Sequence, residues 1–261
     1  MCGGFLSMSY IVTPINVDES RLLLFFDEVQ KELKYKNRFK NDKLDEVIEY
    51  IICDGVNKAG VKKGAVLYRA RIYNNLDAQE KFYSEDDVVF QGYDQIGSFV
   101  NKELDHVSDG RCNPKWIPYL YASKSEKCCI HEVRPRIKDF VSVAKIKVKA
   151  NLKIVDFSCL ASWYEKKDFR EIIPGVQNSL LCIYLGELFS VPHRNEDDYL
   201  ITQYISEKIK NAGYDGIAYK SSLYDGYNDI NYVIFNYDNC EAVSSQLCHI
   251  KALDVKYDKS R

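Results

Sequence analysis

Residues 110–135 read GRCNPKWIPYLYASKSEKCCIHEVRP, and this stretch predicts a turn, a short strand and a helix in close succession. Gly110 permits the tight backbone of a turn, and the aromatic and aliphatic run over 119–123 is typical of a strand. Ser123, followed three residues later by Glu126, forms a capping-box pattern that begins a helix. The helix must end before the last proline of the stretch, because the residue ahead of a proline disfavours the helical conformation.

Another strand is predicted upstream of this stretch. Residues 66–72 read VLYRARI, and their alternation with period two places Arg69 and Arg71 on the same face of a strand. Two interpretations stay open from this pattern alone. The pair either forms a solvated or salt-bridged edge, or it clamps an anion.

The remaining pattern is mixed. Periodicity predicts helices over 20–36, 41–52 and 197–212, and strands over 141–150, 152–158, 180–189, 217–220 and 232–236. Residues 73–109 show no clear period and are interpreted as a long, partly irregular insertion. This order of elements predicts the α+β class.

We expect a helical N-terminal extension over residues 1–62 and one larger domain over residues 63–261. The two N-terminal helices are apolar on one face and need a surface to cover it. That surface belongs to the main domain, to a second copy or to a partner protein, and we favour the main domain.

Composition excludes several classes of protein. The chain of 261 residues is 46% hydrophobic and 28% charged, which is typical of a folded globular protein. A net charge of −2 provides no basic field, so neither a nucleic acid nor a membrane is expected as a partner. Residues 1–12 lack a positive leader region, and apolar runs such as residues 22–26 are far shorter than a membrane span. We therefore predict a cytoplasmic protein.

The usual catalytic and metal-binding motifs are missing from the sequence. The nine cysteines are odd in number and show no two-residue spacing, so we interpret them as reduced thiols. His131 and Glu132 have no second histidine one turn later, and we predict no metal site. A phosphate-binding P-loop, a dinucleotide-binding glycine fingerprint and a serine nucleophile elbow are also missing, which disfavours a kinase or a Rossmann dehydrogenase.

The order of the remaining features resembles the RES domain. In the first half these are an arginine on an early strand, a GRxNP turn, a Leu-Tyr-Ala strand and a helical glutamate. The second half agrees at Tyr199, Thr202, Gln203, the GYDGI run over 213–217, Tyr219, Ser221, Ser222, Asn231 and Phe235. The resemblance covers roughly residues 64–240.

This resemblance implies a strongly bent mixed β-sheet flanked by helices, similar to the fold of ADP-ribosyltransferases. RES-domain proteins are toxins that degrade NAD⁺ or transfer its ADP-ribose, and a helix-turn-helix antitoxin commonly accompanies them. NAD⁺ is therefore the expected substrate and such an antitoxin the expected partner, while an oligomer stays open. The implied residues are Glu132 and Arg69 as catalytic groups, and Arg111, Tyr121, Ser221 and Asn231 as substrate-binding groups, with Ser222 as a rival to Ser221.

These residue types suit cleavage of the bond between nicotinamide and ribose. The reaction develops positive charge on the ribose, which a carboxylate such as Glu132 stabilises. Planar guanidinium groups bind the two phosphates through paired hydrogen bonds, and Tyr121 can stack on or wall the nicotinamide. Nicotinamide leaves as a neutral base, so no general acid is needed.

Three functions remain open. The first is an NAD⁺ glycohydrolase or phosphorylase that depletes cellular NAD⁺, and the second is an ADP-ribosyltransferase acting on a protein or small molecule. The third is a catalytically silent binding module, since Cys112 and Trp116 depart from the pattern of the family. In that case Arg111 braces its turn and Glu132 is a solvated charge.

Overall fold

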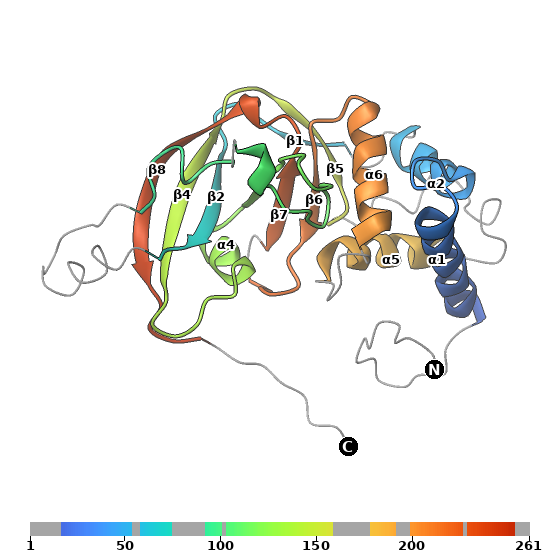
Figure 1. The fold of residues 1–261 in the computed structure, drawn as a ribbon, viewed down its shortest axis with the longest axis horizontal. Coiled ribbons are helices and arrows are strands. Elements are labelled where there is room, and N and C mark those ends of the chain that lie inside the picture. Colours follow the sequence, from blue (N-terminus) through green and yellow to red (C-terminus); the bar gives the residue numbers. More distant parts are fainter. Residues whose placement is uncertain are drawn as a thin grey trace, which may run out of the picture.

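The computed structural model describes residues 17–53, 58–74, 92–100, 103–158, 178–191, 199–226 and 229–253. Within these ranges one sheet of eight strands has the order β1-β5-β6-β7-β3-β2-β4-β8 (Figure 1). The strands are β1 (Lys58–Val61), β2 (Val66–Ile72), β3 (Leu120–Ser123), β4 (Phe140–Val148), β5 (Leu152–Asp156), β6 (Gly216–Lys220), β7 (Ile230–Ile234) and β8 (Cys240–His249). Strands β5 and β6 are parallel and the other neighbours are antiparallel, so the sheet is mixed.

Helices pack at one end of the sheet and on its middle. They are α1 (Val17–Tyr35), α2 (Asp42–Cys53), α4 (Glu126–Glu132), α5 (Asn178–Ser190) and α6 (Leu200–Asn211), with short 3₁₀ turns η1 (Leu104–His106) and η5 (Tyr237–Asn239). Helices α5 and α6 contact β6, and α1 and α2 contact α6 (Figure 1). Helix α4 contacts β2, β3, β4 and β7. The sheet is thus covered by two separate groups of helices.

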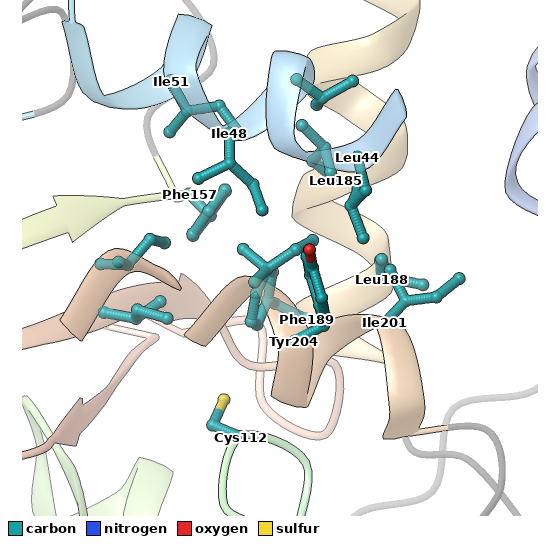
Figure 2. Packing of buried hydrophobic residues seen from close by; sticks show 14 of the residues in the cluster. Leu44, Ile48, Ile51, Cys112, Phe157, Leu185, Leu188, Phe189, Ile201 and Tyr204 are labelled. Carbon is teal, nitrogen blue, oxygen red and sulfur yellow. The ribbon is translucent and has the colours of Figure 1, made fainter. Parts of the chain in front are cut away.

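The largest hydrophobic core joins the N-terminal helices to the sheet. Val47 of α2, Leu185 of α5, Ile205 of α6 and Val233 of β7 are all fully buried in this one cluster. Figure 2 shows side chains of this cluster that come from α2, α5 and α6 and point into the space between these helices. The helices over 17–53 therefore contribute to the same core as β5, β6 and β7.

We expect Phe26→Ala to test this shared core. Phe26 is 1% exposed, and its ring stacks on that of Tyr184 in α5 with centroids 4.4 Å apart. Truncating a buried phenylalanine leaves a cavity and costs about 3–5 kcal/mol of unfolding free energy, which urea denaturation measures. Leu24 lies on the same helix but is 62% exposed, so Leu24→Ala is the matched control. Equal stabilities of the two variants would contradict a shared core.

The predicted α+β class, with a mixed sheet flanked by helices and preceded by a helical region, is confirmed. The boundary between residues 62 and 63 stays a prediction. Strand β1 lies on the N-terminal side of that boundary and pairs with β5. In the part of the chain that the structure describes, no helix is long and apolar enough to cross a membrane.

Four local predictions were wrong or incomplete. Residues 180–189 form helix α5 rather than a strand, because Leu181, Leu185 and Leu188 bury one helical face. Strand β8 was missed, since its weakly apolar sequence depends on pairing with β4. Strand β1 was also missed. Helix α4 is capped by Ser125, whose Oγ accepts the backbone N–H of Cys128 at 3.2 Å, and not by Ser123.

Residues 73–109, interpreted as an irregular insertion, are described only in part. Residues 75–91 and 101–102 lie outside the described ranges. The described remainder contains turns and the short η1 segment, and no longer helix or strand. The two terminal nitrogens of the Arg71 guanidinium donate to this segment, Nη1 to the carbonyl of Gly97 at 2.6 Å and Nη2 to the carbonyl of Phe99 at 2.9 Å. Arg71 therefore holds the segment against β2.

Candidate active site

A cavity of about 320 Å³ opens between helix α4 and the strands β2, β3, β6 and β7. Residues from each of these elements line it, including Arg69 of β2, Tyr121 and Ser123 of β3, Glu132 of α4, Tyr219 of β6 and Asn231 of β7. The strand order explains this convergence, since β6, β7, β3 and β2 are successive neighbours. Within the described lining, Arg69 is the one cation and Glu132 the one carboxylate.

The Glu132 carboxylate is held through one of its oxygens. Oε1 accepts a hydrogen bond from Ser221 Oγ at 2.6 Å and another from Asn231 Nδ2 at 2.7 Å. No described residue donates a hydrogen bond to the other oxygen, Oε2. Two charge-assisted bonds to Oε1 restrict the rotation of the carboxylate. One oxygen is thus anchored, and the other is left to interact with a ligand.

Ser221 is oriented by the backbone that follows it. Its Oγ accepts the N–H groups of Leu223 and Tyr224, both at 3.1 Å. A hydroxyl has a single proton to donate, and here that proton goes to Glu132. The neighbouring Ser222 instead donates to the carbonyl of Ser190 at the end of α5. Of these two rivals, Ser221 is the one that contacts the carboxylate.

Arg69 presents a guanidinium with unused hydrogen-bonding capacity. Its Nη1 donates to the backbone carbonyl of Tyr121 at 2.7 Å. Its Nε is buried and has no partner among the described residues. Burial, followed by the nearby charge of Arg71, lowers the pKa of Arg69 to about 10. A desolvated guanidinium with free donors beside a cavity is suited to binding an anion.

The Tyr121 ring lines the cavity, while its hydroxyl is used inside the protein. That hydroxyl donates to Asn113 Oδ1 at 2.8 Å and accepts the backbone N–H of Cys112 at 3.0 Å. Burial raises the pKa of Tyr121 well above its usual range. A Cβ atom on Gly110 would lie 2.5 Å from Asn113 Oδ1, so this turn requires glycine. The turn thereby fixes the aromatic wall of the cavity.

The sequence matches the model of a known family. A RES-domain model matches residues 95–258, well over half of the 261 residues. The chain belongs to the RES-domain family. Among solved structures, a chain of the M. tuberculosis MbcT–MbcA toxin–antitoxin complex is similar at 14% identity, with a TM-score of 0.41, over 80% of this chain and 93% of that chain. No curated protein sequence matches the chain.

The matched part of the RES domain contains most of the predicted site. Tyr121, Glu132, Ser221 and Asn231 all lie within it. Arg69 precedes the matched residues, yet it lines the same cavity. The sheet brings Arg69 there because β2 pairs with β3. In the described ranges, no group of three or more His, Cys, Asp or Glu side chains could hold a metal ion.

Arg111 of the RES domain does not line the described cavity. Its guanidinium lies 5.1 Å from the ring centroid of Tyr219 and donates to the carbonyl of Phe189 in α5. The backbone carbonyl of Arg111 accepts from Thr202, and Gln203 Nε2 donates to the carbonyl of Gly110 at 2.9 Å. In this structure Arg111 therefore joins the turn to α5 and contacts Tyr219, which lines the cavity.

Sequence reasoning missed the contribution of Ser123 to the site. Ser123 was interpreted as a helix cap, but it stands opposite Asn231 in the β3–β7 ladder and opposite Tyr68 in the β2–β3 pair. Tyr68 and Cys129 also line the cavity without having been predicted there. For Cys129 a signal was available, because it lies three residues before Glu132 and residues three apart on a helix share a face. For Tyr68 the signal was its position next to Arg69 in the sequence.

We expect Tyr121→Phe to lower stability more than it lowers affinity for a ligand. The substitution keeps the ring that lines the cavity, but leaves Asn113 Oδ1 and the Cys112 N–H without their partner. An unsatisfied buried polar group costs about 1–3 kcal/mol, which chemical denaturation measures. Tyr68→Phe is the matched control, because the Tyr68 ring lines the same cavity and its hydroxyl has no hydrogen bond to the described residues. Unchanged stability would show that the phenol does not support the turn.

Proposed function

We propose that this RES-domain protein cleaves NAD⁺ at the bond between nicotinamide and ribose, and acts as a toxin by depleting cellular NAD⁺. The observation that carries the proposal is the pairing of one anchored carboxylate, Glu132, with one desolvated guanidinium, Arg69, in the lining of a single cavity. Membership of the RES-domain family supports the same activity.

The charges of the two residues match those of the substrate. As the glycosidic bond stretches, positive charge develops at the anomeric carbon, and a preorganised carboxylate nearby lowers the energy of that state. Glu132 meets this need because Oε1 is anchored, while Oε2 accepts no hydrogen bond from the described residues. In the proposal, Oε2 faces the ribose.

Arg69 would bind a phosphate of the dinucleotide. Its free Nε and its remaining guanidinium N–H groups can form paired, charge-assisted hydrogen bonds with phosphate oxygens. Binding an anion would also offset the cost of burying this cation. A cavity of about 320 Å³ is at the lower end of the size of ligand sites, and it suits the nicotinamide riboside end of the molecule. The Tyr121 ring would wall that end.

The proposed reaction balances without an oxidant or a metal. The bond between C1′ and the ring nitrogen breaks, and its electron pair leaves with nicotinamide as a neutral pyridine. An acceptor oxygen then bonds to C1′ and loses its proton. With water the product is ADP-ribose, and with phosphate it is ADP-ribose that carries an additional phosphate on C1′. Much of the rate enhancement would come from positioning.

The acceptor is tested by product analysis. We expect purified protein incubated with NAD⁺ labelled in the adenylate half to release nicotinamide and to convert the label into a small soluble product. Adding phosphate distinguishes phosphorolysis from hydrolysis, because only phosphorolysis adds a further phosphate to the ADP-ribose, at C1′. Label on protein would instead establish an ADP-ribosyltransferase, and NAD⁺ binding without turnover would indicate a silent module.

The proposed place of action and the proposed partner follow from membership of the RES-domain family. As an NAD⁺-depleting toxin the protein would act in the cytoplasm, and a helix-turn-helix antitoxin would be its partner. Expression in bacteria should arrest growth as NAD⁺ falls, and an inactive variant expressed to the same level should not. Growth arrest with an unchanged NAD⁺ pool would contradict depletion as the toxic event.

A further inference from the structure

A buried chain of side chains stands behind the Glu132 carboxylate. Asn231 and Ser123 are only 4% and 2% exposed, and they face each other across the β3–β7 ladder. Ser123 Oγ donates to Asn231 Oδ1 at 2.6 Å, and Asn231 Nδ2 donates to Glu132 Oε1 at 2.7 Å. The hydrogen bonds thus run in one direction, from Ser123 through the amide to the carboxylate.

The direction of this chain depends on which way the Asn231 amide is turned. Rotating the amide by half a turn exchanges its oxygen and its nitrogen. The oxygen would then face Glu132 Oε1, and two acceptors would meet with no proton between them. Ser123 adds to this preference, because its hydroxyl donates to Oδ1 and would lose that bond if Nδ2 stood in the same place. The Cys128 thiol is a second, weaker donor to the same oxygen, at 3.5 Å.

We infer that Ser123 is a positioning residue, which acts through the Asn231 amide to hold the Glu132 carboxylate in its working orientation. The kinetic part of this inference rests on the proposed NAD⁺ cleavage. Ser123 does not need to touch the substrate, because its single proton is already donated to Asn231. Its effect therefore belongs to the chemical step rather than to binding.

The first test compares three serine variants. Ser123→Ala should lower kcat about tenfold, which corresponds to a free energy of the size that one hydrogen bond contributes, and should leave KM nearly unchanged. Ser123→Thr keeps the hydroxyl and should restore most of the activity. Ser142 is also 2% exposed in the sheet, on β4, so Ser142→Ala controls for loss of a buried serine hydroxyl. A fall in kcat no larger for Ser123→Ala than for Ser142→Ala would overturn the inference.

A double-mutant cycle separates positioning from simple packing. Asn231→Ala removes the amide through which Ser123 is inferred to act. In that background Ser123→Ala should cause no further loss of kcat, because interacting residues show non-additive effects. An additional tenfold loss would mean that Ser123 acts by another route, and would overturn the inference.

A spectroscopic measurement tests whether Ser123 holds the Asn231 amide, whether or not the protein cleaves NAD⁺. The Asn231 side-chain amide protons, followed by NMR in the intact protein, should exchange slowly with solvent in the wild type and in Ser142→Ala. They should exchange measurably faster in Ser123→Ala. If the wild type releases no nicotinamide, the proposed function fails, while this measurement still decides whether Ser123 holds the amide. Identical exchange in all three proteins would overturn the inference.

Discussion

Glu132→Gln should fold normally and lose nicotinamide release by about 10³-fold in kcat, a loss typical of removing a preorganised group that stabilises charge in the transition state. Glutamine preserves the length and shape of the side chain, and its carbonyl oxygen can still accept from Ser221 and Asn231. The variant lacks only the negative charge that offsets the developing charge on the ribose. Steady-state kinetics with chromatographic detection of nicotinamide measures the effect.

The matched control for this prediction is on the same helix. Glu126 is the first residue of α4 and is exposed to solvent, so Glu126→Gln changes the net charge equally without altering the cavity. We expect it to retain the activity of the wild type. Full activity in Glu132→Gln, with a circular dichroism spectrum like that of the wild type, would contradict the catalytic role of Glu132.

Arg69→Ala should reduce kcat/KM about 10²-fold, chiefly through a higher KM, because a buried guanidinium that binds a phosphate contributes strongly to affinity. Stability should change little. Burial disfavours the charged form of Arg69 and lowers its pKa to about 10. Removing the guanidinium therefore removes a desolvation cost together with the hydrogen bond to the Tyr121 carbonyl. Isothermal titration with NAD⁺ in a Glu132→Gln background measures affinity without turnover.

Two further variants make the Arg69 result specific. Arg69→Lys keeps a positive charge but loses the planar, paired geometry, and it should bind NAD⁺ with an affinity between the wild type and Arg69→Ala. Lys145→Ala removes an exposed cation from β4 and should bind NAD⁺ as tightly as the wild type. Unchanged kcat and KM in Arg69→Ala would show that Arg69 does not bind the substrate and has a structural role.

The elements that could be predicted from sequence are those whose periodicity is local. Helix α1 and strand β2 were predicted from spacing alone, because each follows a regular pattern within its own residues. Helix α5 was mistaken for a strand because its run is apolar on several faces, and short apolar runs do not distinguish the two. Strand β8 depends on its pairing with β4, which local sequence does not encode.

The sequence predicted which residues form the candidate site better than it predicted the hydrogen bonds between them. Arg69, Tyr121, Glu132 and Asn231 were all expected at the site, and the structure brings them to one cavity. Ser123 and Asn231 are 108 positions apart, and only the register of β3 and β7 places them together.

Arg111 illustrates the opposite difficulty. A glycine-permitted turn that presents an arginine predicts a ligand contact as readily as a structural brace. Here its guanidinium lies over Tyr219 and bonds to the Phe189 carbonyl. Sequence spacing could not have located α5, which supplies that carbonyl.

The most direct test of the central claim is a time course of free nicotinamide, measured by NMR after purified wild-type protein is mixed with an excess of NAD⁺. We expect nicotinamide to appear over many turnovers, in step with the loss of NAD⁺, and the Glu132→Gln protein measured beside it to release almost none. Intact NAD⁺ in the presence of the folded wild-type protein would contradict the claim that this cavity cleaves the nicotinamide–ribose bond.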